Sequence, residues 1–136
     1  MTPAQRLRVL LDRPGILVMP GCHDAMSARL IEEAGFELGF MSGFAVSAAR
    51  LGMPDTGLIS YGELADQGQN ICRAVSIPMI GDGDTGFGSA QNIKRTVHGY
   101  CAAGFASIML EDQIAPKRCG HTEGKAVVAQ SGCFKK

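Results

Sequence analysis

The sequence predicts an α/β fold built on a parallel sheet. Four short apolar segments that begin near residues 16, 37, 76 and 106 are typical of strands, and segments with helical spacing of apolar residues separate them. Parallel neighbours need a long crossover connection, which each interval provides. The chain has 136 residues, of which 46% are hydrophobic and 19% charged, so we expect one folded domain.

The first part of the chain predicts a helix, a strand and a second helix. Leucines at helical spacing precede Pro14, and the apolar run of residues 15–21 is typical of a strand buried on both faces. Asp24 can cap a helix over residues 25–34. Gly35 suits the left-handed residue that ends such a helix.

The alternation then repeats, with a long loop between the next strand and its helix. The further predicted strands are residues 38–41, 75–80 and 106–110. Ser60 and Glu63 form a capping box that opens a helix to about Arg73. Ser89 can cap another helix, which runs to Ala103. These units complete four predicted strands joined by helical crossovers.

Polar side chains follow each predicted strand. They are His23 and Asp24, Ser42 to Phe44, Asp82 to Asp84, and Glu111 to Gln113. The carboxyl ends of parallel strands meet at one edge of a sheet, and binding sites form there. The sequence therefore predicts a site that these four groups share.

Three carboxylates of this set predict a metal site. Asp82, Asp84 and Glu111 provide the oxygen ligands that Mg²⁺ prefers, with Mn²⁺ as the alternative ion. Acidic residues also cap turns, so a purely structural role is an alternative. The segment Gly81–Gly86 further matches a dinucleotide fingerprint, although two aspartates beside a pyrophosphate disfavour nucleotide binding.

A second group of reactive residues surrounds Cys119. Lys117, Arg118 and His121 lie beside this thiol, and nearby positive charge favours a thiolate. Gly120 and Gly124 bracket a loop, which is typical of a segment that moves as a lid. The alternatives are a plain surface loop, or a zinc site that also uses Cys133 and lacks a recognised ligand spacing.

Charge and cysteine content exclude several classes of partner. Thirteen basic and thirteen acidic residues give a formal charge of zero, so we expect no nucleic-acid or membrane-surface binding. No apolar run is long enough for a membrane span, and we expect no signal peptide. Five cysteines without a CxxC pair favour free thiols in the cytoplasm. The expected partner is a small molecule or another protein.

Six motifs, in this order along residues 6–128, resemble the isocitrate lyase and phosphoenolpyruvate mutase superfamily. They are Pro20-Gly-Cys-His-Asp-Ala25, Met41-Ser-Gly-Phe-Ala-Val-Ser-Ala48, Leu51-Gly-Met-Pro-Asp55, Gly81-Asp-Gly-Asp-Thr-Gly86, Leu110-Glu-Asp-Gln113 and Pro116-Lys-Arg-Cys-Gly-His121. The resemblance is strongest to the shorter members, which include methylisocitrate lyases and carboxyvinyl-carboxyphosphonate phosphorylmutases. It implies a small carboxylate as the substrate.

The resemblance also implies roles for the residues of these motifs. Ser42, Gly43 and Phe44 would bind the carboxylate and carbonyl end of an oxo-acid. Asp82 would bind Mg²⁺ directly, and Asp55, Asp84 and Glu111 would act through metal-bound waters. The segment from Lys117 to His121 would close over the substrate, with Cys119 as the proton donor or acceptor.

The implied fold is a TIM-type (β/α)₈ barrel, of which this chain would supply the first four βα units within residues 1–128. Residues 129–136 depart from the superfamily, so we expect a truncated product whose activity is doubtful. The resemblance implies homo-oligomers for full-length members of the superfamily. The oligomeric state of this shorter chain stays open. Cys119 favours a Mg²⁺-dependent carbon–carbon lyase. The alternatives are a phosphoryl mutase and a non-catalytic fragment that pairs with a full-length paralogue.

Overall fold

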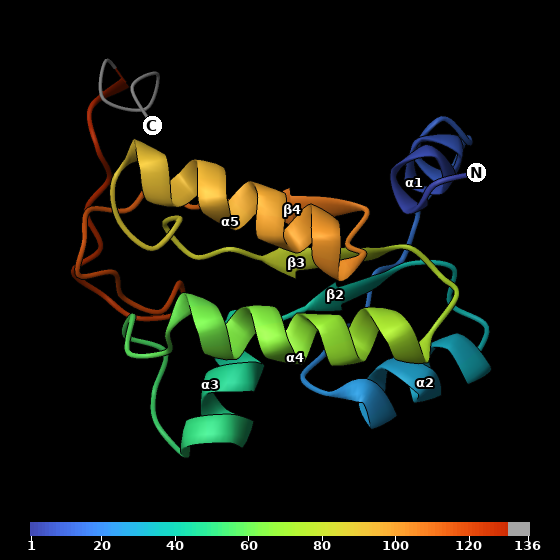
Figure 1. The fold of residues 1–136 in the computed structure, drawn as a ribbon, viewed down its shortest axis with the longest axis horizontal. Coiled ribbons are helices and arrows are strands. Elements are labelled where there is room, and N and C mark those ends of the chain that lie inside the picture. Colours follow the sequence, from blue (N-terminus) through green and yellow to red (C-terminus); the bar gives the residue numbers. More distant parts are fainter. Residues whose placement is uncertain (131–136) are drawn as a thin grey trace.

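A four-stranded parallel sheet organises the computed structural model, which describes residues 1–130 (Figure 1). The strands are β1 (Gly21–Cys22), β2 (Gly39–Met41), β3 (Met79–Asp82) and β4 (Ser107–Met109). The helices are α1 (Pro3–Leu11), α2 (Ala25–Glu33), α3 (Gly43–Leu51), α4 (Tyr61–Ala74) and α5 (Ala90–Ala103). The strands pair in the order β1-β2-β3-β4. The predicted α/β class and parallel pairing are confirmed.

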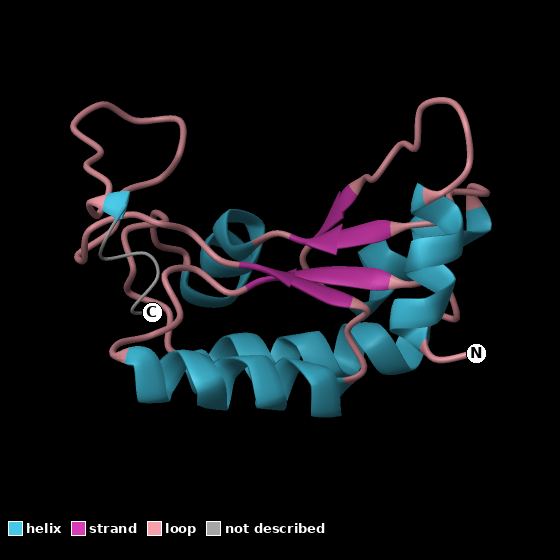
Figure 2. Cartoon of the chain, turned by 90° about the horizontal axis from the view of Figure 1, so that it is seen from above, coloured by secondary structure: helices cyan, strands magenta, loops and turns pink. Residues whose placement is uncertain are grey.

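Helices α2, α4 and α5 lie side by side along one face of the sheet (Figures 1 and 2). The main apolar core fills the space between these helices and the strands. Its most deeply buried side chains include Met41, Leu64, Ile71, Met79 and Tyr100. Removing this apolar surface from water is the main stabilising contribution to the arrangement.

The predicted helix ends are confirmed by hydrogen bonds and backbone angles. The Asp24 side chain accepts a bond from the backbone of the third helical residue of α2, and Ser60 does the same for α4. Ser89 stands at the N-cap of α5, where its backbone N–H donates to the side chain of Asn92. Gly35 adopts a φ of +86°, the left-handed geometry that glycine favours.

The first strand is shorter than predicted. Residues 15–20 are not in a strand, and only Gly21 and Cys22 pair with β2. Ile16 is 95% exposed and Val18 is 56% exposed. Within residues 1–130, β1 has a strand neighbour on one side only, so no further strand covers the apolar segment before it. An apolar run indicates that a segment tends to be buried, but it does not indicate which other part of the protein would cover it.

The predicted long loop after β2 contains a helix. Ser42 is the N-cap of α3, since its Oγ accepts a hydrogen bond of 3.3 Å from the N–H of Ala45. Gly52 ends the helix in the left-handed conformation with a φ of 61°. The third strand also differs from its prediction: it spans Met79–Asp82 rather than residues 75–80. Asp82 is therefore part of β3 and shares the rigidity of the sheet.

No helix within residues 1–130 has the length and apolar content needed to cross a membrane. Cys22, Cys72, Cys101 and Cys119 are free thiols. The predicted boundary at residue 128 stays a prediction, and most of the predicted tail lies outside the described residues.

Candidate active site

Three of the four predicted groups of site residues meet at the carboxyl ends of the strands. The fourth group, His23 and Asp24, stands at the start of α2, where Asp24 caps the helix. The loop between α3 and α4 and the loop after β4 meet at this end of the sheet (Figures 1 and 2). A cavity of about 710 Å³ lies between them. Its lining includes Phe44, Asp55, Lys117, Arg118, Cys119 and His121.

Asp82 is buried and held by two backbone amides. Its Oδ2 accepts a hydrogen bond of 3.0 Å from the N–H of Gly43, and its Oδ1 accepts one of 3.0 Å from the N–H of Asp84. Its backbone carbonyl accepts a bond of 2.6 Å from the buried hydroxyl of Tyr100. The carboxylate is therefore fixed in place, as a metal ligand must be for tight binding.

Asp82, Asp84 and Glu111 form one cluster, as the sequence predicts. Each offers a carboxylate oxygen, and these oxygens all lie within 4.8 Å of one another. The N–H of Glu111 donates a bond of 2.7 Å to the carbonyl of Asp84, which joins the segments that follow β3 and β4. Burial raises the pKa of Asp84 to about 6 and raises that of Glu111.

Lys117 reaches the cluster from the loop after β4. Its buried Nζ lies 2.7 Å from Oδ1 of Asp55, is in contact with Oδ1 of Asp84, and lies 3.8 Å from Oε1 of Glu111. Burial alone lowers the pKa of a lysine, but the hydrogen bonds to Asp55 and Asp84 outweigh it and hold the Lys117 pKa above its usual value. The ammonium group therefore stays charged and neutralises part of the cluster.

The side chains fit a divalent cation. The carboxylates of Asp55, Asp84 and Glu111 lie within 4 Å of the ammonium group of Lys117, and Asp82 adds a fourth carboxylate beside Asp84 and Glu111. Buried charges of one sign need compensation, and the ammonium supplies too little. Carboxylate oxygens suit Mg²⁺ or Mn²⁺, and a magnesium ion keeps several waters that can span the distance to the more remote acids.

Cys119 and His121 form a thiol–imidazole pair in the cavity. Sγ of Cys119 lies 3.4 Å from Nδ1 of His121. The His121 ring packs edge-on against the ring of Phe44, with 6.3 Å between their centroids. The structure thus brings the predicted thiol, its histidine and one predicted substrate-binding residue to the same wall. Among residues 1–130, no third zinc ligand joins Cys119 and His121, and Cys133 of the zinc alternative lies outside the described residues.

The other two predicted substrate-binding residues have structural tasks. Oγ of Ser42 caps α3, and the N–H of Gly43 is bonded to Asp82. A Cβ atom on Gly43 would lie 2.8 Å from Oδ2 of Asp82, so only glycine fits at this position. Gly43 thus serves the metal-site candidate directly, which its place in the motif does not indicate.

The amides of the fingerprint segment are not arranged to bind a phosphate. The N–H of Gly83 donates to the carbonyl of Met109, that of Asp84 to Asp82, and that of Gly86 to the carbonyl of Gly83. A phosphate site needs such amides directed at the ligand. The structure therefore favours the interpretation of this segment as a carboxylate turn over the nucleotide-binding alternative.

The loop of residues 115–125, which we call the Cys119 loop, is closed at its base. The N–H of Ile114 donates a bond of 2.8 Å to the carbonyl of Ala126, and that of Val128 donates one of 2.9 Å to the carbonyl of Asp112. Gln113 lies in this stem and its side chain bonds to both Glu111 and Arg118. Sequence reasoning placed Gln113 among the groups of the predicted site but gave it no task of its own, because its partners are known only from the fold.

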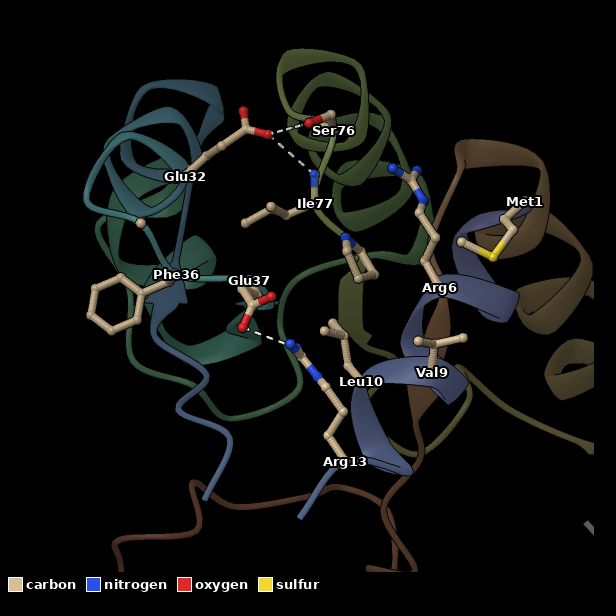
Figure 3. Close-up of a pocket in the computed structure, with 12 residues that line it drawn as sticks. Met1, Arg6, Val9, Leu10, Arg13, Glu32, Phe36, Glu37, Ser76 and Ile77 are labelled. Atoms are coloured by element: carbon tan, nitrogen blue, oxygen red, sulfur yellow. Dashed lines mark hydrogen bonds and ion pairs between the residues drawn. The ribbon is translucent and has the colours of Figure 1, made fainter. Parts of the chain in front are cut away.

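A second cavity, of about 520 Å³, lies at the opposite end of the sheet beside α1 (Figure 3). Its border contains an ion pair between Arg13 and Glu37. It also contains hydrogen bonds from Ser76 and Ile77 to Glu32. It contains none of the predicted site residues. The cavity at the carboxyl ends is therefore the candidate active site.

Comparison with curated proteins finds relatives that match most of this chain. The chain is 49% identical over 124 residues to "Carboxyvinyl-carboxyphosphonate phosphorylmutase, chloroplastic" of Arabidopsis thaliana, which covers 90% of this chain and 37% of that protein. It is 45% identical over 130 residues to "2,3-dimethylmalate lyase" of Eubacterium barkeri, covering 96% of this chain and 45% of that one. The chain thus spans less than half the length of these relatives.

Solved structures give the same result. A structure of oxaloacetate acetylhydrolase with the inhibitor 3,3-difluorooxalacetate superposes with a TM-score of 0.93 at 38% identity, covering 98% of this chain and 46% of that one. A phosphonopyruvate hydrolase complex with oxalate and Mg²⁺ superposes with a TM-score of 0.80 at 39% identity, covering 86% and 41%. The chain corresponds to under half of a TIM-barrel fold, as predicted.

The model of the family "Phosphoenolpyruvate phosphomutase" matches residues 7–132, which is nearly the whole chain. Curated relatives include both lyases and a phosphorylmutase, so the comparisons establish the superfamily of enzymes without selecting one activity. On this evidence, the chain belongs to the phosphoenolpyruvate phosphomutase family, within the isocitrate lyase and phosphoenolpyruvate mutase superfamily.

Proposed function

We propose that the chain provides the metal-binding and thiol-bearing part of a Mg²⁺-dependent carbon–carbon lyase. The substrate class is a small 2-oxo or 2-hydroxy di- or tricarboxylate. One observation carries the proposal: carboxylate oxygens of Asp82, Asp84 and Glu111 lie within 4.8 Å of one another. The cavity that holds Cys119 lies at the same end of the sheet.

Asp82, Asp84 and Glu111 are the residues that would hold the cation, with Asp55 acting through water. A bound Mg²⁺ supplies positive charge where a substrate oxygen becomes negative as the carbon–carbon bond breaks. Lys117 holds Asp55 and Asp84 in place, and this anchors the Cys119 loop against the acids. The closed loop excludes water from the reacting atoms.

Cys119 is the proposed acid in this scheme. Its thiol would give a proton to the carbon that is left negative by bond cleavage, and the resulting thiolate would regain a proton through His121. Phe44 forms an apolar wall beside the imidazole. The amino terminus of α3 begins at Ser42 and favours the negative end of a carboxylate substrate.

A phosphoryl mutase is the second candidate. The observation that favours it is the 49% identity with the Arabidopsis phosphorylmutase. Such an enzyme would use the same metal ligands, since Mg²⁺ also stabilises a transferring phosphoryl group. The two candidates differ in the bond that breaks, and product analysis separates them.

The third candidate is a non-catalytic chain that binds a full-length relative. Its support is the apolar surface at both edges of the described sheet: Ile16, before β1, is 95% exposed, and Met109, on β4, is 41% exposed. Open edges with apolar flanks favour pairing with further strands. Co-elution with a complete member of the family in gel filtration would favour this candidate, and separate elution would exclude it.

Magnesium titration and a substrate panel test the leading proposal. We expect the protein to bind Mg²⁺ in calorimetry and Asp82→Ala to lose binding, because the fixed ligand is removed. Asp66→Ala is the matched control, since Asp66 is exposed on α4 and its ion pair within residues 1–130 is with Arg50, which is not part of the acid cluster. Oxaloacetate, methylisocitrate and dimethylmalate are then assayed for cleavage with Mg²⁺. Unchanged magnesium affinity in Asp82→Ala would refute the metal assignment.

A further inference from the structure

We propose that Gln113 is a positioning residue that connects the acid cluster to the Cys119 loop. The inference rests on the proposed function, because it assigns the loop's orientation to the metal site. Gln113 is buried and lies between Glu111, which belongs to the cluster, and Arg118, which precedes Cys119.

The amide group of Gln113 binds three partners at once. Nε2 donates a hydrogen bond of 2.6 Å to Oε2 of Glu111 and one of 2.9 Å to the carbonyl of Arg118. Oε1 accepts a bond of 3.0 Å from the N–H of Arg118. One side chain therefore fixes both backbone polar groups of Arg118 and one oxygen of a candidate metal ligand.

The Cys119 loop is also held by its stem and by Lys117, but these contacts act at other residues than the Gln113 bonds do. The stem bonds join residues 112 and 114 to residues 126 and 128 and do not involve the backbone of Arg118 or Cys119. Lys117 fixes the loop through its own side chain. Within residues 1–130, the hydrogen bonds to the backbone of Arg118 come from Gln113. Cys119 follows directly, so these bonds set where the thiol lies relative to Glu111.

The chemistry of the contact requires a glutamine. A glutamate has no N–H to give to Glu111 or to the carbonyl of Arg118, and it would place two carboxylates 2.6 Å apart at the present contact. A leucine has a similar size but neither donates nor accepts. An asparagine is one methylene shorter and cannot reach both sides.

The test compares the alkylation rates of individual cysteines in the full chain with iodoacetamide, resolved by peptide mass spectrometry. Cys119 is 8% exposed and reports on the loop. Cys101 is exposed on α5, so its rate measures the reactivity of the reagent with an accessible thiol. Cys22 is buried in the core, so its rate measures global unfolding. The chain thus carries its own two reference thiols.

Without metal, we expect Gln113→Leu and Gln113→Glu to raise the Cys119 rate by about tenfold, since opening of the loop no longer breaks the two bonds to Arg118. Rates at Cys101 and Cys22 should stay at the wild-type values. Gln91→Leu, at an exposed glutamine of α5, is the control variant and should leave all three rates unchanged.

With Mg²⁺, the wild-type Cys119 rate should fall about fivefold or more. A bound ion would hold Glu111 in place, Glu111 would hold Gln113, and Gln113 would keep the Cys119 loop closed. In Gln113→Leu, calorimetry should still detect Mg²⁺ binding, but the Cys119 rate should no longer respond to it. A merely structural residue would not uncouple binding from the loop in this way.

Two results would overturn the proposal: a Cys119 rate in Gln113→Leu equal to that of the wild type, or a Cys22 rate that rises together with it. The second result would mean that Gln113 supports the whole fold. Absence of Mg²⁺ binding by the wild type would instead refute the proposed function, and the metal-free rates would still decide the role of Gln113.

Discussion

The backbone N–H of Gly43 donates a hydrogen bond of 3.0 Å to Oδ2 of Asp82, across 39 positions of the sequence. The bond joins the start of α3 to the end of β3. The Asp82 carboxylate lies so close to residue 43 that a side chain there would clash with it. The backbone that follows β2 thus binds the carboxylate at the end of β3. The candidate metal ligand is held by the fold itself.

Gly43→Ala should therefore destabilise the protein. The added Cβ would lie 2.8 Å from Oδ2 of Asp82, so either the carboxylate or the start of α3 must move. We expect a loss of about 1–3 kcal/mol in the free energy of unfolding, measured by urea denaturation. Gly120→Ala is the control, because a Cβ there has no neighbour within 4 Å. Equal stabilities of the two variants would contradict this account.

Lys117→Met should remove the positive charge that the acids share. Asp55 and Asp84 would then be buried without their partner, and breaking a buried ion pair in this way costs about 3–5 kcal/mol. Unfolding in urea at pH 7 without metal measures the loss. Lys94→Met, at an exposed position of α5, should have little effect. If Lys117→Met unfolds at the wild-type midpoint, the ammonium does not stabilise the cluster.

Tyr100→Phe should weaken the support beneath Asp82. The buried hydroxyl of Tyr100 donates to the Asp82 carbonyl at 2.6 Å, and without it this carbonyl loses its partner. The expected loss is about 1–3 kcal/mol in the free energy of unfolding, while the stacking of the ring on Phe105 is retained. Tyr61→Phe, which removes a hydroxyl from a ring packed at the edge of the core, provides the comparison. A smaller loss for Tyr100→Phe than for Tyr61→Phe would argue against this support.

The cap of α2 should make stability depend on pH. The Ser27 N–H donates a bond of 2.7 Å to Asp24, and this bond holds the pKa of the Asp24 carboxyl below its usual 3.8. A lowered pKa contributes stability that is present above pH 3.8 and is lost as the pH falls through the folded-state value. Asp24→Ala should cost about 1 kcal/mol at pH 7, and less in acid.

Asp24→Asn separates the charge from the cap. Asparagine still accepts the bond from Ser27 but does not titrate in this range, so we expect nearly wild-type stability at pH 7 without the acid-dependent loss. Thermal unfolding between pH 2.5 and 7 checks both variants. A difference between Asp24→Ala and the wild type that stays constant over this range would refute the assignment of the titration to Asp24.

Local patterns predicted the helices and their ends well. Asp24, Ser60 and Ser89 all stand at N-caps, because capping depends on residues three positions apart. The strands were predicted less accurately. Ile16 and Val18 have the composition of a buried strand but are exposed, since pairing depends on a neighbour that the local sequence does not specify. Helix α3 was missed although Ser42 could have indicated its start.

The roles assigned to Asp82, Cys119 and the other motif residues remain proposals, but their proximity was predicted correctly. The rule that carboxyl ends of parallel strands meet at one edge was sufficient to bring Asp82, Asp84 and Glu111 together. It could not provide the partners of single atoms. That Gly43 bonds to Asp82 and Gln113 to Arg118 depends on backbone positions to within a fraction of an ångström.

The sequence by itself determined the alternation of helices and strands, the parallel order of the sheet and the set of chemically active residues. These follow from periodicity, chain connectivity and residue type, which are properties of the covalent chain. Only the tertiary structure decided that Lys117 is buried among the acids and that Gln113 joins Glu111 to the Cys119 loop. Such contacts form between segments far apart in the chain, and their geometry exists only after packing has fixed both segments.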